Sequence, residues 1–273
     1  MVPAGSAAPA TPLAIIGGTG VDIVTELKAQ GPLPIDTPYG RAEVYSARWG
    51  ERPVYFLSRH GAGHVLPPHR VPYRANIWAL RHLGVEWILA TNACGSLRKE
   101  WLPGQLVVID QFIDFTKNRP ATFFDGEGGK VIHTDVTEPY CPILRKALIA
   151  AAGAEGVSIA ESGCYVCTEG PRYETAAEIR FFQSIGGDLV GMTGVPEVTL
   201  AREVGICYAA LGLVTNLAAG LGESPCEPIS HQEVTRLMQK QGVVVWRLLR
   251  RTIDLLPPAR TVGRCPCTRS GCG

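Results

Sequence analysis

Apolar residues along this chain fall into two alternating patterns. Short continuous apolar runs bounded by glycine and polar residues predict buried strands, and apolar positions that recur at helical spacing predict helices. The runs predict strands at 13–16, 54–57, 87–90, 106–109, 164–167, 189–190 and 207–214, and the periodic segments predict helices at 73–83, 142–152, 176–185, 196–204 and 230–249. Because strands and helices alternate with no repeat or interdomain linker, we expect one α/β domain.

The two ends of the chain differ from this pattern. Residues 1–12 are rich in alanine and proline and lack the basic start and apolar core of a signal peptide, so we expect a flexible tail. The domain is expected over residues 13–256, followed by a cysteine-containing tail at 257–273. No apolar run approaches the ~20 residues that a membrane helix needs, which predicts a cytoplasmic protein.

Composition narrows the class of partner. The chain is 46% hydrophobic and 19% charged, as in ordinary globular proteins, and its formal net charge of +1 gives no electrostatic reason to expect nucleic acid or an anionic membrane as a partner. Three of its nine cysteines crowd the tail, at Cys265, Cys267 and Cys272. They could form a metal site or a redox-active Cys-x-Cys pair, but the spacing lacks a familiar four-ligand zinc pattern, which favours free thiols on a mobile terminus.

Polar residues follow several predicted strands, at the edge of an α/β sheet where ligands collect. Asn216 stands where the apolar run 207–214 ends, and a buried amide costs free energy unless its donors and acceptors are paired. Glu174, Thr193 and the Arg59–His60 pair lie near other strand ends. Together these groups predict a small-molecule site.

Phosphate is the ligand that these residues favour. Arg59 suits an oxyanion, because a guanidinium binds phosphate oxygens through charge-assisted hydrogen bonds. The glycine turn 17–20, with the hydroxyl of Thr19, can also hold a free phosphate. His60, His64 and His69 are an alternative set of metal ligands, but the glycines and prolines around them argue against a helix that presents them together.

Several ordered motifs resemble one enzyme family. They are IIGGTGVD, SRHGAGH, PYRANIWAL, TNACGSL, DQFIDFTKNRP, TEGPRYET and GMTGVPEVTLARE, and the resemblance spans about residues 13–255. The chain is similar to the methylthioadenosine phosphorylase / purine nucleoside phosphorylase family of trimeric enzymes. The resemblance implies a three-layer α/β/α sandwich with a mixed, partly barrel-like sheet. It also implies phosphorolysis of purine nucleosides in a homotrimer, or a hexamer of two trimers, with phosphate as co-substrate and neither cofactor nor metal.

The same resemblance assigns roles to individual residues. Met192 would lie under the ribose, Tyr173 against the base, and Glu174 and Asn216 at the purine edge, with Leu217 and Ala218 also binding the substrate. Glu174, Asn216 and His60 would be the catalytic groups. His133 would reach the sugar 5′ end of a neighbouring subunit's site, and His231 would bind the 5′-hydroxyl. The residues expected around phosphate are Thr19, Arg59, His60, Asn92, Ala93 and Thr193.

Two departures from the methylthioadenosine enzymes bear on the substrate. Those enzymes carry Asp-x-Asp where this chain has Asn216-Leu217-Ala218, and a small hydroxyl residue where it has Glu174. An amide can donate to O6 and accept from N7–H, and a carboxylate accepts from N1–H of a 6-oxopurine but repels the N1 lone pair of adenine. We therefore expect inosine and guanosine as substrates. The alternatives are a methylthioinosine or methylthioadenosine phosphorylase and, more remotely, a non-catalytic purine-binding protein or a metal-dependent hydrolase.

Overall fold

The computed structural model describes residues 10–17, 28–126, 131–222, 231–260, 265 and 267, with only the backbone described for His231 and Glu233. Its eleven described strands form one mixed sheet, in which β2-β3-β4-β1-β5-β10-β9-β7 is the main path and β11, β6 and β8 branch from β5. The strands are β1 Leu13–Gly17, β2 Gln30–Thr37, β3 Gly40–Trp49, β4 Arg52–Ser58, β5 Trp87–Ser96, β6 Leu106–Val108, β7 Gln111–Phe115, β8 Ile159–Ala160, β9 Cys164–Thr168, β10 Leu189–Gly191 and β11 Cys207–Leu217.

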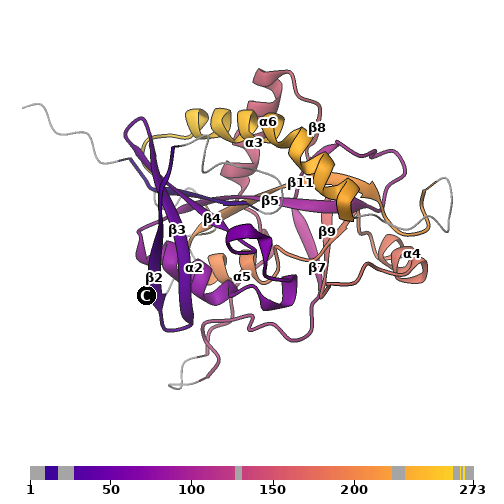
Figure 1. Cartoon of the computed structure of the whole chain (residues 1–273), viewed down its shortest axis with the longest axis horizontal. Coiled ribbons are helices and arrows are strands. Elements are labelled where there is room, and N and C mark those ends of the chain that lie inside the picture. Colours follow the sequence, from indigo (N-terminus) through magenta and orange to yellow (C-terminus); the bar gives the residue numbers. More distant parts are fainter. Residues whose placement is uncertain are drawn as a thin grey trace, which may run out of the picture.

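Helices cover both faces of this sheet. Helices α3 and α6 pack against each other over one face, and α2 and α5 lie on the opposite side (Figure 1). The described helices are α2 Tyr73–His82, α3 Pro142–Glu155, α4 Ala176–Ser184, α5 Glu197–Glu203 and α6 His231–Leu255, with 3₁₀ turns at Ala62–His64 and Pro68–Arg70. This is the expected layered α/β fold. None of the described helices combines the length and apolar character needed to cross a membrane.

Strand β1 shows why the apolar runs are continuous. Its residues are all buried, and successive side chains alternate between the two faces of the sheet. Leu13 and Ile15 pack with residues of α3 and α6, whereas Ala14 and Ile16 pack with residues of α2 and α5. A strand buried on both faces has no polar side to present, so alternation disappears from its sequence.

The central strand β5 changes partners along its length. Residues 87–90 pair with β1, residues 95–96 pair with β10, and β11 runs parallel to β5 throughout. The sheet therefore divides between Ala90 and Gly95, next to the ends of β4 and β10. Crevices at such points of divergence are where ligands bind in α/β sheets.

Two kinds of difference separate this fold from the sequence expectation. Strand β5 continues to Ser96 and β11 to Leu217, with a register shift between Val214 and Asn216, so the polar residues lie inside strands rather than after them. Pairing with β11 prolongs β5 after β1 has diverged. The expectation also omitted β2, β3, β7 and β8; β2 is an edge strand with two prolines and a mostly exposed surface, a pattern that resembles a loop.

The C-terminal cysteines require a correction. Cys265 and Cys267 are free cysteines, as the sequence favoured, but they are 2% and 1% exposed and belong to the apolar cluster on the α3/α6 face, so they do not lie on a mobile tail. Their depth cannot be read from spacing alone, because the residues that cover them come from distant parts of the chain. Cys272 lies outside the described residues.

Candidate active site

A cavity of ≈ 440 Å³ opens where the sheet divides around β5. Its walls come from the turn after β4, the end of β5, the segment before α4, the end of β10 and the end of β11. Most of the residues expected at the site line this one cavity: Arg59, His60, Ala93, Tyr173, Glu174, Met192, Thr193, Asn216 and Ala218.

The remaining expected residues stand apart from this set. Asn92 is buried behind the wall, Leu217 does not line the cavity, and His133 is exposed in the segment before α3. Thr19 and the side chain of His231 lie outside the described residues. The roles given to all of these residues stay predictions.

Arg59 is held in a fixed orientation by a buried carboxylate. Its Nε and Nη2 donate to the two oxygens of Glu197 at 2.8 and 2.7 Å, and its Nη1 donates to the Thr91 carbonyl at 2.8 Å. Tyr208 adds a hydrogen bond to Glu197 at 2.6 Å. Three of the five guanidinium N–H groups are thus occupied, which leaves two for an anion in the cavity. Such a bidentate pair fixes the plane of the guanidinium.

His60 is neutral in the physiological range. Burial lowers its pKa to about 4, and the positive charge of Arg59 contributes in the same direction. Its Nδ1 lies 2.8 Å from the Leu66 carbonyl oxygen, which can only accept, so Nδ1 carries the proton and Nε2 keeps a lone pair. A neutral imidazole of this form can accept a hydrogen bond from a protonated phosphate oxygen.

Asn92 acts on the site through Thr193. Its Nδ2 donates to the carbonyl and to the hydroxyl oxygen of Thr193, both at 3.2 Å, and the Tyr165 hydroxyl also bonds the Thr193 carbonyl. Thr193 lines the cavity close in sequence to Met192. We therefore describe Asn92 as a positioning residue, which fixes the hydroxyl of Thr193 in the wall of the cavity.

Glu174 and Asn216 bring further polar groups to the cavity wall. Glu174 accepts a hydrogen bond from the Thr168 hydroxyl at 2.7 Å, and burial raises its pKa above the ordinary value for glutamate. The Asn216 amide donates to the Leu217 carbonyl at 2.8 Å and accepts from the Thr215 hydroxyl at 2.9 Å. Together these two bonds leave one N–H and one lone pair of the amide for a ligand.

Arg119 ties together the segments that carry these residues. Its buried guanidinium donates to the carbonyl oxygens of Met192, Glu169 and Val195, each at 2.8 Å. Those carbonyls lie on the segments after β9 and β10. Gly170, with φ +63, lets the chain approach Met192 so closely that a Cβ atom there would lie 2.6 Å from its sulfur. Met192, which lines the cavity, is thereby packed closely against the segment after β9.

Sequence reasoning missed Glu197, Tyr208 and Arg119. Glu197 carried one usable signal, since it is a carboxylate at the start of a partly apolar helical segment and a buried charge requires a partner. Its partner could not be named, because Arg59 lies 138 residues away in the chain. The three histidines of the metal alternative do not form one ligand set among the described residues: His60 and His64 stack with centroids 4.1 Å apart, and His69 does not line the cavity.

Known proteins resemble this chain over nearly its whole length. The Phosphorylase superfamily model matches residues 12–253. The 6-oxopurine nucleoside phosphorylase of Pyrococcus furiosus is 50% identical over 261 residues, covering 93% of this chain and 96% of that protein. A probable S-methyl-5′-thioinosine phosphorylase of Methanopyrus kandleri is 48% identical over 266 residues, or 95% and 97% of the two chains. The solved structure of a Schistosoma mansoni methylthioadenosine phosphorylase in complex with adenine has a TM-score of 0.85 at 35% identity and covers 90% of this chain and 91% of that chain.

Proposed function

This chain belongs to the phosphorylase superfamily, and we propose that it is a 6-oxopurine nucleoside phosphorylase, which converts inosine or guanosine and phosphate to the free base and ribose 1-phosphate. The observation that carries the proposal is one cavity lined by Arg59, His60 and Thr193 and also by Glu174 and Asn216. The first three groups suit an oxyanion, and the last two suit the N1–H, O6 and N7 edge of a 6-oxopurine.

The reaction needs no covalent enzyme intermediate. A phosphate oxygen attacks the anomeric carbon of the sugar as the glycosidic bond breaks, and the electron pair of that bond passes to the purine. Arg59 and Thr193 would hold phosphate beside the sugar, so that the enzyme contributes mainly position. Asn216 would donate to O6 and accept from a protonated N7, which stabilises the charge on the departing base.

The described residues determine the group at the 5′ position of the sugar less closely than they determine the base. We expect His231 to bind a 5′-hydroxyl from the start of α6, because the helix dipole there favours a neutral imidazole that can donate and accept. Val234, one turn along the same helix, lines the cavity. This is compatible with either a hydroxyl or a methylthio group, and the relative in M. kandleri carries the name of a methylthioinosine enzyme.

A substrate panel assayed with and without phosphate tests the proposal. Inosine, guanosine, adenosine, methylthioinosine and methylthioadenosine are compared by kcat/KM. We expect release of base from inosine and guanosine only when phosphate is present, and a lower kcat/KM for both adenine nucleosides. A preference for methylthioinosine would revise the 5′ assignment and leave base recognition intact, whereas base release without phosphate would contradict phosphorolysis itself.

The double variant E174S/N216D tests the two base-recognition residues directly. We expect the inosine/adenosine ratio of kcat/KM to fall by about tenfold or more, because losing a polar contact to the base costs ~1–3 kcal/mol. Glu161→Ser, the same change at an exposed glutamate outside the cavity, is the matched control. An unchanged ratio in the double variant would show that these residues do not discriminate between the bases.

A further inference from the structure

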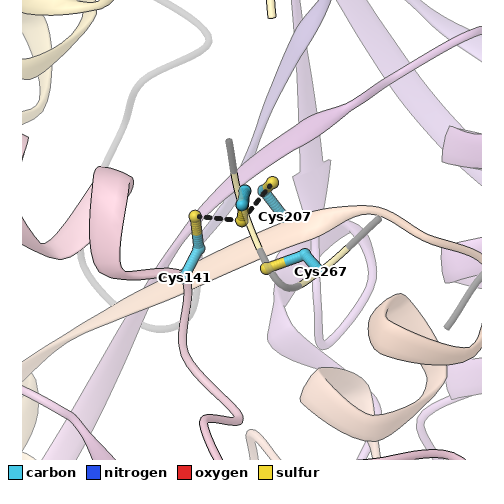
Figure 2. A group of neighbouring side chains, drawn as sticks. Cys141, Cys207 and Cys267 are labelled. Atoms are coloured by element: carbon cyan, nitrogen blue, oxygen red, sulfur yellow. Dashed lines mark hydrogen bonds between the residues drawn. The ribbon is translucent and has the colours of Figure 1, made fainter. Parts of the chain in front are cut away.

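Four cysteines from three separate parts of the chain meet on the α3/α6 face of the sheet. Cys141 precedes α3, Cys207 begins β11, and Cys265 and Cys267 belong to the C-terminal segment. Their sulfur atoms all lie within 4.8 Å of one another, and Figure 2 shows those of Cys141, Cys207 and Cys267 turned toward a common centre. None of the four lines the cavity around β5.

The spacing of the sulfur atoms fits a tetrahedral metal site. The Sγ of Cys265 lies 3.3 Å from that of Cys141 and 3.5 Å from that of Cys207. In a tetrahedral zinc site with Zn–S bonds of about 2.3 Å, neighbouring sulfur atoms are about 3.8 Å apart, a value within the range seen here. One central ion would contact all four sulfur atoms, whereas a disulfide could join Cys265 to only one of its two neighbours.

The chemistry of the four ligands selects a thiophilic ion. The site offers only sulfur donors and is buried, with the four residues between 0% and 2% exposed. Four thiolates in a closed, water-excluding site favour Zn²⁺ over the oxygen-seeking ions Mg²⁺ and Ca²⁺.

The four cysteines differ in how the fold holds them. Backbone hydrogen bonds fix Cys141 and Cys207 to the sheet, whereas Cys265 and Cys267 follow the last described helix. The Cys141 N–H bonds the Tyr208 carbonyl at 2.7 Å, and the Cys207 N–H bonds the Glu86 carbonyl at 2.9 Å, so both lie on the core of the fold. Cys265 and Cys267 follow the end of α6 at Leu255. A shared ion would therefore fasten the C-terminal segment to the sheet.

We propose that Cys141, Cys207, Cys265 and Cys267 form a structural metal site that binds one Zn²⁺ per chain. On binding, the four thiols release four protons to solvent and form four Zn–S bonds, with no change in oxidation state. All four coordination positions are filled by protein, so the ion has no open position for substrate. Its role is to stabilise the fold on the side of the sheet that carries α3 and α6.

Metal content and stability test the site. The untagged full-length protein is prepared under reducing conditions, reconstituted with ZnCl₂ and desalted, and its zinc is measured by mass spectrometry. We expect one zinc per chain in the wild type and in Cys164→Ser, a half-buried cysteine outside the cluster. The variant C265S/C267S should lose the zinc, and its melting temperature should fall to that of the chelator-treated wild type. Replacement by Co²⁺ should give the absorption bands of a tetrahedral thiolate site in the wild type only.

Three results would overturn the proposal. One is a reconstituted, reduced wild type that retains no zinc. Another is a C265S/C267S variant that still binds zinc at one ion per chain. The third is two disulfides among the four cysteines in protein that was never reduced, seen as an intact mass lower by four hydrogen atoms together with no zinc. Phosphorolysis assayed at low temperature does not depend on the site, so its loss in every preparation would count against the proposed function instead.

Discussion

At the scale of single residues, Glu197 determines what Arg59 can do. A fully buried arginine without a partner would carry a large desolvation cost, and the bidentate pair with Glu197 removes much of it. The pair also balances the charge of Arg59, so the positive potential for an anion comes from two oriented N–H groups and the neighbouring donors rather than from an excess of charge. We therefore expect Arg59 to bind an anion through the direction of its N–H groups more than through its net charge.

Glu174 predicts a pH-dependent choice of base. Burial raises its pKa, so as pH falls this carboxylate is protonated earlier than an ordinary glutamate. The deprotonated form accepts from N1–H of a 6-oxopurine, whereas the protonated form can donate to N1 of adenine. We expect the inosine/adenosine ratio of kcat/KM to fall as pH is lowered from about 8 to about 5.

The inosine/adenosine ratio of kcat/KM depends only on groups that distinguish the two bases. Titration of phosphate or of His60 affects both nucleosides alike and cancels. Glu174→Gln removes the titrating group and should make the ratio independent of pH while preserving most of the side chain's shape. A wild-type ratio that stays constant over this range would mean that Glu174 does not contact N1.

Residue-level prediction from the sequence brought together residues that share one cavity. Arg59, His60, Glu174 and Asn216 were chosen because an Arg-His pair, a carboxylate and a strand-end amide each have few uses inside a protein, and all four line the cavity around β5. Their roles stay predictions. Asn92, which was expected beside phosphate, does not line the cavity; its amide donates to Thr193, and its role at phosphate stays a prediction. Which of two neighbouring polar residues faces a ligand depends on strand register, which spacing does not determine.

At the scale of elements, the start of α4 positions Glu174. Thr175 is the N-cap of this helix: its hydroxyl accepts from the Glu178 N–H at 3.1 Å, and the Glu178 carboxylate accepts from the Thr175 N–H at 2.7 Å. Arg172 binds the same carboxylate through two N–H groups at 2.8 and 2.7 Å. Residues on both sides of Glu174 are thus fixed by one capping box.

Loss of this cap should affect both stability and binding. Thr175→Ala removes the hydroxyl that caps α4, and we expect the free energy of unfolding to fall by ~1 kcal/mol. Because Glu174 directly precedes the cap, KM for inosine should rise by severalfold with a smaller change in kcat. Ser184→Ala, at the other end of the same helix, is the matched control. If stability falls while KM stays the same, the cap supports the helix without positioning Glu174.

Elements buried on both faces were predicted well, and those at the margins were not. The apolar runs of β1, β5 and β11 are covered by helices on both faces of the sheet. A continuous apolar run in the sequence therefore indicates a strand in the centre of the sheet. β2 is mostly exposed at the sheet edge, where composition is weakly constrained. The polar ends of β5 and β11 resembled loops, since strand pairing rather than hydrophobicity holds residues such as Asn92 and Asn216 extended.

At the scale of the whole molecule, the described part of one chain brings Arg59 and Thr193 to the same cavity as Glu174 and Asn216, but His133 stands apart and exposed. We infer that the active unit is a homotrimer in which His133 reaches the 5′ end of a neighbouring subunit's site. His133→Ala should then raise KM for inosine by about fivefold, as expected for a lost hydrogen bond worth ~1 kcal/mol. The separate variant Arg59→Ala should lose most activity within its own site.

Mixing these two variants tests whether sites are shared between subunits. In a trimer assembled from both, some sites combine the intact Arg59 of an H133A subunit with the intact His133 of an R59A neighbour. We expect co-expressed chains to show a kcat/KM above the average of the two pure variants, because those mixed sites are complete. Chains purified separately and combined without exchange should show only that average. Sedimentation velocity identifies the oligomer in each sample; a fully active monomer, or co-expressed chains no more active than the average, would contradict the shared site.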